Sequence, residues 1–188
     1  MNAEKLIANI LSILIAVAAI SALAQLSIAL PEKLSVAPIT GQSLAVLVAA
    51  HILKWKKASI SILLYLFLGA IGLPVFSNFS SGVDVLFGKS AGYMLGFLIA
   101  SIVVGIMATK QKEKFPYYFI QMAVGTLTIL LFGGIALLRF LDIGEVLSLG
   151  IKPFLAGGFV KILLGSILLS VYRRFRFLMN FDKANANP

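Results

Sequence analysis

The sequence predicts an all-α integral membrane protein, with six transmembrane helices in a single bundle and both termini in the cytoplasm. Hydrophobic residues make up 60% of the 188 positions and charged residues only 12%, about half of the charged fraction of a typical soluble domain. The mean hydropathy is +1.03. The basic residues gather in clusters that separate long apolar runs, as they do in polytopic membrane proteins.

Six apolar runs are the expected crossings, and without an internal repeat they form one domain over residues 1–188. A helix needs about 20 residues to cross the bilayer core. The second and third runs are shorter, so they would draw on loop residues or a locally thinned bilayer. The polar end of the chain, 177–188, is expected to be a flexible tail. The expected spans are 6–30, 38–53, 58–74, 91–109, 116–138 and 153–172.

The distribution of Lys and Arg predicts the orientation. With a cytoplasmic N-terminus, the inside segments hold eleven basic residues, mostly at 54–57, 110–114 and 173–176, and the outside loops hold four. Because positive charge favours the cytoplasmic side of a membrane, both termini are expected inside. The net charge of +9 comes from these clusters, so the expected surroundings are a lipid bilayer and not nucleic acid.

Two features of the first run bear on its role. Ala22-Leu23-Ala24 resembles a signal-peptidase site, but the apolar stretch is longer than a signal-peptide core and continues past it, so an uncleaved helix is expected. Small residues also recur at four-residue spacing, a pattern that lets helices approach closely. They could serve packing inside the bundle or docking of an external partner. These residues are Ala8, Ser12 and Ala16.

The sequence offers little for catalysis. None of the seven carboxylates lies in an expected span, and the chain has no nucleotide-binding loop or paired acid. Cysteine is absent and His51 is the single histidine, so neither a metal site nor a cofactor is expected. We therefore interpret the chain as a binding or transport protein and not an enzyme, and any ATP-driven work must come from another subunit.

Two outer loops carry polar and aromatic groups suited to a ligand. The loop 73–93 is long and rich in Gly, Ser and Phe, and long loops in compact folds are usually functional lids or disordered segments. A lid is one interpretation, and an interfacial loop whose phenylalanines enter the headgroup region is the other. The candidate residues are Thr40 and Gln42 in the loop 31–42, and Asn78, Phe79 and Tyr93 in the loop 73–93.

Three other polar residues have simpler interpretations. His51 precedes Lys54-Trp55-Lys56, so it is expected at the membrane interface and not in a proton relay. Gln25 and Gln121 lie in apolar runs, where hydrogen bonding between helices is the usual role of an amide.

Lys161 is the one basic residue inside an expected span. It ends the stretch PFLAGGFVK (153–161), and the ten residues after it carry no charge. A charge at such depth costs about 2.5–3.5 kcal/mol on insertion scales and usually faces a cavity or a partner. With no carboxylate one helical turn away, an anionic ligand is the natural partner of Lys161.

Three stretches together resemble the BioY family, the biotin-binding S components of energy-coupling factor transporters. They are APITGQSLAVLVA (37–49), YLFLGAIGLPVF with GKSAGYMLGF (65–76 and 88–97), and PFLAGGFVK (153–161). The family usually has Thr at position 43, where this chain has Ser43. In the third stretch it usually reads P-F-x-P-G-D-x-x-K, so Ala156 replaces a proline and Gly158 replaces an aspartate.

The resemblance implies a six-helix subunit that captures biotin from outside with high affinity. It would dock on a membrane-embedded coupling subunit driven by two ATPase subunits, in the cell membrane of a bacterial-type organism, and release biotin inside. In the family, the aspartate and the lysine of the third stretch contribute to the biotin site, and only Lys161 carries over. The first-helix face of small residues would meet the coupling subunit.

Two alternatives stay open. One is an S component for a different small carboxylate, which the replacement of the family aspartate by Gly158 suggests. The other is a structural membrane subunit that binds no ligand.

Overall fold

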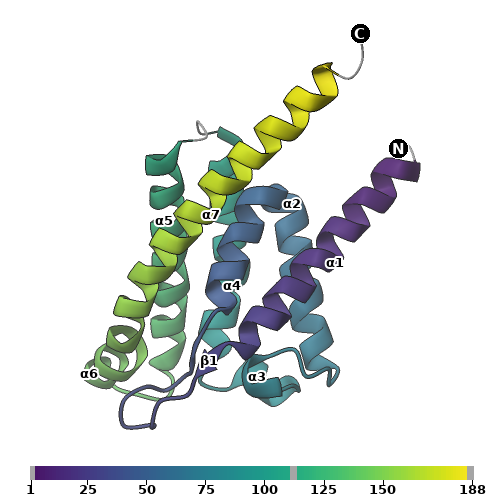
Figure 1. Ribbon diagram of the computed structural model, residues 1–188. Coiled ribbons are helices and arrows are strands. Elements are labelled where there is room, and N and C mark those ends of the chain that lie inside the picture. Colours follow the sequence, from purple (N-terminus) through teal and green to yellow (C-terminus); the bar gives the residue numbers. More distant parts are fainter. Residues whose placement is uncertain (1–2, 111–113, 186–188) are drawn as a thin grey trace.

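The structure, a computed structural model, describes residues 3–110 and 114–185. Five long helices form a bundle: α1 (Ala3–Gln25), α2 (Gln42–Ala70), α4 (Ala91–Lys110), α5 (Phe115–Leu137) and α7 (Lys152–Asn185). The short elements are β1 (Ser27–Ile28), β2 (Ile39–Thr40), the 3-10 turn η1 (Ser77–Phe79), α3 (Val83–Phe87), α6 (Ile143–Glu145) and the π-helical turn η2 (Val146–Ile151). Figure 1 shows both termini at one end of the bundle, and β1, α3 and α6 at the other.

Helix α2 is two helical arms that meet at Lys54. The φ angle of Lys54 is 62°, so the backbone leaves the helical region there, and Figure 1 shows the chain reversing direction. The Lys54 ammonium donates a hydrogen bond to the Ala108 carbonyl at 2.9 Å. Gly105 makes the reversal possible, because a Cβ at that position would lie 2.4 Å from the backbone nitrogen of Trp55.

Four helical stretches of the described chain are long and apolar enough to cross a membrane: α1, α4, α5 and the continuous stretch Ile143–Met179. The structure is therefore a mostly helical, membrane-type fold. The arms of α2 are not among them, because the helix breaks at Lys54 and three lysines, Lys54, Lys56 and Lys57, lie between its two apolar runs.

The expected bounds differ from the observed ones at the ends of the first three runs and in the tail. The second run was expected from residue 38 and the third to residue 74, but α2 covers Gln42–Ala70. The first helix was expected to reach residue 30 but ends at Gln25, because the next residues form β1, which pairs antiparallel with β2. Helix α7 continues to Asn185, so residues 177–185 of the expected tail are helical, and their flexibility stays a prediction. The last part of that expectation, residues 186–188, lies outside the described residues.

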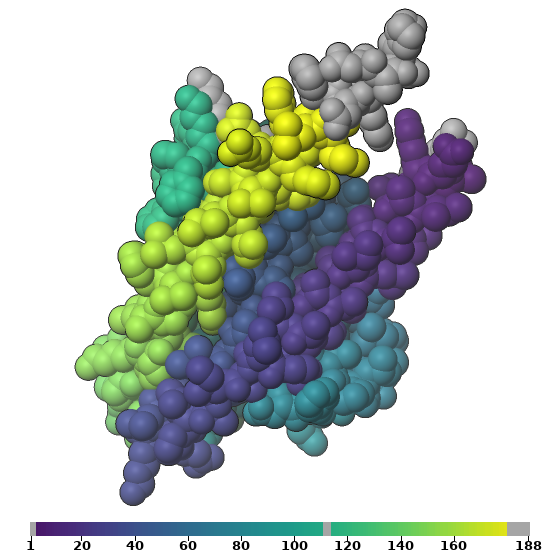
Figure 2. Space-filling view, in the orientation of Figure 1, coloured from purple at the N-terminus to yellow at the C-terminus, as the bar shows by residue number. Residues whose placement is uncertain are grey.

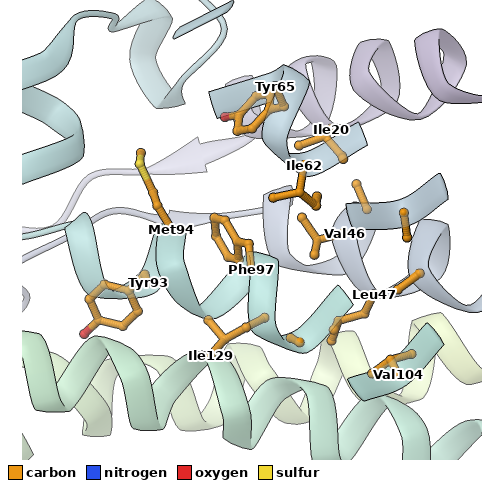
Figure 3. Packing of buried hydrophobic residues seen from close by; sticks show 14 of the residues in the cluster. Ile20, Val46, Leu47, Ile62, Tyr65, Tyr93, Met94, Phe97, Val104 and Ile129 are labelled. Atoms are coloured by element: carbon orange, nitrogen blue, oxygen red, sulfur yellow. The ribbon is translucent and has the colours of Figure 1, made fainter. Parts of the chain in front are cut away.

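The core lies between α2, α4 and α5, with one side of α1 packed on it. Figure 3 shows Ile20 of α1 beside Ile62 and Val46 of the two α2 arms, with Phe97 of α4 close by. Helices α1 and α7 lie at the edge of the bundle. Only 17% of the residues in the apolar stretch of α1 and 22% of those in the apolar stretch that includes α7 are buried, against 56% in α4. Most of the surface of α1 and α7 is therefore available to lipid or to another protein.

Candidate ligand-binding site

A cavity opens near the end of the bundle that carries the short elements. Its wall is formed by β2 and the start of α2, by the loop around η1 and the start of α4, and by α5 and α7. Its volume is about 70 Å³, which is room for a few water molecules. The polar residues that line it are Thr40, Gln42, Ser43, Ser77, Ser90, Tyr93, Thr126 and Lys161, and its apolar lining includes Met94, Phe97, Ile129, Leu130 and Phe154.

Lys161 lies on the cavity wall, where α7 passes the start of α2. Its ammonium donates a hydrogen bond to the Ser43 hydroxyl at 3.1 Å. No carboxylate of the described residues lines the cavity. The two nearest acids along the chain, Asp142 and Glu145, cap α6 through reciprocal side-chain and backbone hydrogen bonds. The cavity is thus lined by one cation and several neutral hydrogen-bonding groups.

Tyr93 forms a wall of the cavity with its ring. The ring packs on Gly133 of α5, where an added Cβ would lie 2.3 Å from a ring carbon, and its centroid is 5.4 Å from that of Phe154. The hydroxyl donates to the Gly150 carbonyl at 2.5 Å. Figure 3 shows Tyr93 projecting toward α5, while Met94 and Phe97 project from α4 in another direction.

Gln42 links the cavity to the second arm of α2. Its side-chain amide donates to the Tyr65 hydroxyl at 2.7 Å, and that hydroxyl donates to the Val75 carbonyl at 3.2 Å. Gln42 is 4% exposed, so water does not compete for its amide. The bond from its nitrogen to Tyr65 therefore fixes the direction of its side-chain oxygen at the edge of the cavity.

Gly158 leaves part of the cavity wall open. A Cβ at this position would touch only the Thr126 methyl group, at 3.4 Å, which is an ordinary contact distance. Glycine is therefore not required here by packing, and a larger side chain would point beside Thr126. Both residues line the cavity together with Lys161.

Of the residues predicted for the ligand site, five lie together on the cavity wall and two lie outside it. The five are Thr40, Gln42, Tyr93, Gly158 and Lys161. Asn78 and Phe79 lie on the outer side of the same loop as Ser77, which does line the cavity. Phe79 is 70% exposed, and the Asn78 side chain accepts a hydrogen bond from Ser27 at 2.5 Å.

The small residues of α1 border a second hollow. An apolar groove of about 230 Å³ runs between α1, the first arm of α2 and Leu168 of α7, and Figure 2 shows it from the side where α1 and α7 diverge. Ser12 and Ala16 line this groove, whereas Ala8 is exposed and does not. Ala16 is buried, so part of the small-residue face already packs inside the bundle.

His51, which was expected at the membrane interface, is buried in the bundle three residues before the turn at Lys54. Its ring packs edge to face on Tyr118 at 5.1 Å, and its Nδ1 lies 2.6 Å from the Gln121 side-chain oxygen. The cause is the packing of the first α2 arm on α5. Gln121 therefore makes the interhelical contact that its position in an apolar run predicted.

The comparisons with known proteins agree on one family. The sequence model of the BioY family matches residues 1–177. The chain belongs to the BioY family. The biotin transporter BioY of Thermotoga maritima is 35% identical over 133 residues, 70% of this chain and 78% of that protein. The biotin transporter BioY2 of Lactococcus lactis is 38% identical over 136 residues, 71% of this chain and 75% of that protein.

A solved structure shares the fold of this BioY-family chain. The S-component for biotin from an ECF-type ABC transporter superposes with a TM-score of 0.80, covering 93% of this chain and 95% of that chain at 24% identity. The resemblance seen in the sequence motifs is confirmed. BioY proteins are transporter components, so this chain is not an enzyme.

Sequence reasoning missed several residues of the cavity in this BioY-family chain. Ser43 stands where the family usually has threonine, and the structure shows that it accepts a hydrogen bond from Lys161. Thr126 also lines the cavity, and a hydroxyl in an apolar run is a signal that the sequence offers. Phe97 and Phe154 carry no such signal, because phenylalanine is common throughout the chain. Their place in the cavity depends on how the helices pack.

Proposed function

We propose that this BioY-family chain is a high-affinity capture subunit for biotin uptake. The observation that carries the proposal is Lys161, a cation on a cavity wall that donates a hydrogen bond to a neutral hydroxyl, Ser43. A buried or half-buried cation gains most from an anionic partner, and the named relatives of the family are biotin transporters.

The cavity lining fits the three parts of biotin. Its carboxylate suits the Lys161 ammonium, and its apolar bicyclic body suits the ring of Tyr93 with the side chains of Met94 and Phe97. Its ureido group can bond to the hydroxyl of Thr40 and the amide of Gln42. A ligand of this size exceeds the present void of about 70 Å³, so the loops that line the cavity must move outward when it binds.

The arms of α2 would supply the second and third of six crossings. In this arrangement α1, the two arms, α4, α5 and α7 cross in turn, which leaves both termini on one side; their position at one end of the bundle in Figure 1 supports it. The basic clusters at the same end favour the cytoplasm. The chain would then lie in the cytoplasmic membrane of a bacterial-type cell, with the cavity facing outward.

The apolar groove beside α1 would receive the membrane-embedded coupling subunit, which two ATPase subunits drive. Small residues allow close helix approach, and Ser12, Ala16 and Ala19 form one wall of the groove. A helix of the coupling subunit is the occupant that we propose, because α1 and α7 are the least buried long helices. Ala8, which is exposed one turn before Ser12, would extend the same contact.

A binding titration tests the ligand. Purified protein is titrated with biotin, with biotin methyl ester, which lacks the negative charge, and with small carboxylates that lack the ureido group. We expect biotin to bind most tightly and to raise the melting temperature, because a ligand that binds only the folded state stabilises it. The ester should bind much more weakly.

The two alternatives give different results in the same titration. Stronger binding of another small carboxylate than of biotin would support a different substrate, for which Gly158 is the motivating residue. No stabilisation by any of these compounds would favour a structural subunit and contradict the capture function.

Cysteine labelling tests the orientation, and the absence of native cysteine makes it clean. Ser80→Cys and Ser148→Cys should react in intact cells with an impermeant thiol reagent, because both loops are expected outside. Lys114→Cys should react only after the cells are opened. Labelling of Lys114→Cys from outside would reverse the proposed topology.

A further inference from the structure

Gln25, at the end of α1, holds the loop that borders the cavity. Its side-chain amide donates to the Phe76 carbonyl at 3.0 Å and to the Ser21 carbonyl of its own helix at 3.1 Å. Its side-chain oxygen accepts from the Phe79 backbone N–H at 2.9 Å. Gln25 was expected to bond to another helix, but it instead bonds to both ends of one loop turn.

The loop needs such an anchor because its backbone is strained. Asn78 and Phe79 have φ angles of 56° and 54°, in the left-handed region that residues with a side chain seldom adopt. Strained conformations of this kind persist only where the surroundings fix them, and they cluster at ligand clamps. One of the groups that Gln25 fixes is the N–H of Phe79 itself.

The other side of the loop is fixed from within the bundle. Phe76 is fully buried, its ring lies against Gly69, where a Cβ would come within 2.0 Å, and it packs edge to face on Tyr65 at 5.4 Å. Tyr65 bonds in turn to Val75 and to Gln42 of the cavity wall. The turn is thus held by Gln25 outside and by Tyr65 inside, and Ser77 between them lines the cavity.

We infer that Gln25 is a positioning residue for ligand retention: it holds the segment 76–79 in the conformation that closes the cavity. The identity of the ligand in this inference rests on the proposed capture function. The closed conformation of the loop rests on the structure alone. The expected consequence is a slow dissociation of bound ligand, because the ligand can leave only when the loop releases. Gln25 itself does not line the cavity.

The first test compares dissociation rates of biotin from three variants. Gln25→Leu keeps a side chain of similar size but removes both loop bonds. At the usual net contribution of a hydrogen bond, this should speed dissociation roughly 5- to 100-fold. Gln25→Glu keeps the acceptor for Phe79 but loses the donor to Phe76, so its rate should be intermediate. The association rate should rise as well, because the ligand enters past the same loop, so the dissociation rate and not the affinity is the useful measure.

The matched control is Ser27→Ala. It removes the bond from Ser27 to Asn78 on the same turn, but that pair is exposed, so water can replace it. We expect less than a twofold change in dissociation rate. An equal effect of Ser27→Ala and Gln25→Leu would show that any change near the loop loosens it, and would overturn the specific role of Gln25.

The second test needs no ligand and so separates this inference from the proposed function. Ser90→Cys puts a thiol of similar size on the cavity wall, in a chain without native cysteine. Adding Gln25→Leu should speed its modification by a soluble thiol reagent about tenfold, because the loop opens more often. Equal modification rates with and without Gln25→Leu, at equal melting temperature, would overturn the inference even if biotin binds.

Discussion

Two hollows among the described residues differ in chemistry: the first combines polar and apolar side chains, and the second is almost entirely apolar. The cavity near β2 and η1 is lined by hydroxyl groups, an amide and the ammonium of Lys161. The groove beside α1 is lined by aliphatic side chains and alanines, with Ser12 as its polar residue. Both are bordered by the first arm of α2, which contributes Gln42 and Ser43 to the cavity and Leu44 and Ala45 to the groove.

The difference follows from the solvent that each proposed occupant leaves: water for the ligand of the cavity, and lipid for the helix in the groove. A polar ligand coming from water must regain its hydrogen bonds inside the protein, so its site needs fixed donors and acceptors. A helix coming from the lipid loses no hydrogen bonds and gains mainly close packing, so its site needs small side chains and a matching shape. Changes in one hollow should therefore leave the function of the other intact.

The largest expected effect is that of Lys161→Ala on biotin binding. Losing one partner of a desolvated charge pair costs about 2–5 kcal/mol, so the dissociation constant should rise roughly 30-fold to several thousand-fold. The loss should be much smaller for biotin methyl ester. Calorimetric titration of both ligands measures it, and Lys152→Ala, an exposed lysine at the start of the same helix, is the control.

The melting temperature without ligand sharpens the same prediction. Asp142 and Glu145 are engaged with each other in the cap of α6, so removing Lys161 should strand no acid and should not destabilise the empty protein. An alanine variant that melts clearly earlier yet binds biotin normally would make Lys161 a structural residue.

The next effect concerns the groove. Ala19→Leu fills it from an exposed position of α1, and overpacking of this kind costs about 1–3 kcal/mol. Co-purification with the coupling subunit should weaken by roughly 5- to 100-fold, with biotin binding unchanged. Ala18→Leu is the matched control, because Ala18 is exposed but does not line the groove. Loss of biotin binding in Ala19→Leu would break the separation of the two hollows.

A smaller effect is expected for Gly158→Asp, which restores the residue usual in the family. The carboxylate would accept hydrogen bonds from the ureido group, and the space beside Thr126 admits it. We expect the affinity for biotin, relative to a carboxylate without a ureido group, to rise about tenfold. The ratio of the two affinities is the useful measure, because the added carboxylate changes the interaction of Lys161 with the carboxylate of either ligand by the same amount. An unchanged ratio would place the ureido group elsewhere.

The smallest effect is that of Ser43→Ala. It removes the hydroxyl that orients the Lys161 ammonium, and one neutral partner is worth about 0.5–1.5 kcal/mol. Biotin should bind roughly 2- to 10-fold more weakly. Ser59→Ala on the second arm of α2, whose hydroxyl bonds to its own helix, should have no effect. A loss as large as that of Lys161→Ala would mean that Ser43 contacts the ligand directly.

The sequence by itself determined the membrane-type helical class, the positions of α4 and α5 to within about a residue at each end, and the position of Lys161 facing a cavity. These features depend on local hydropathy and on the cost of a charge in an apolar run, and both can be read from consecutive residues. The family motifs likewise pointed to Thr40, Gln42, Tyr93 and Gly158, which the fold brings together on one cavity wall.

Only the tertiary structure decided which groups face each other. The reversal at Lys54 depends on Gly105 of another helix and brings Gln42 to Tyr65, while the packing of the first arm on α5 sets His51 against Tyr118 and Gln121. The contact between Lys161 and Ser43 joins residues 118 positions apart. Such pairings arise because packing selects one arrangement of the helices among many with similar local preferences, and the hydropathy of a single run carries no information about its neighbour.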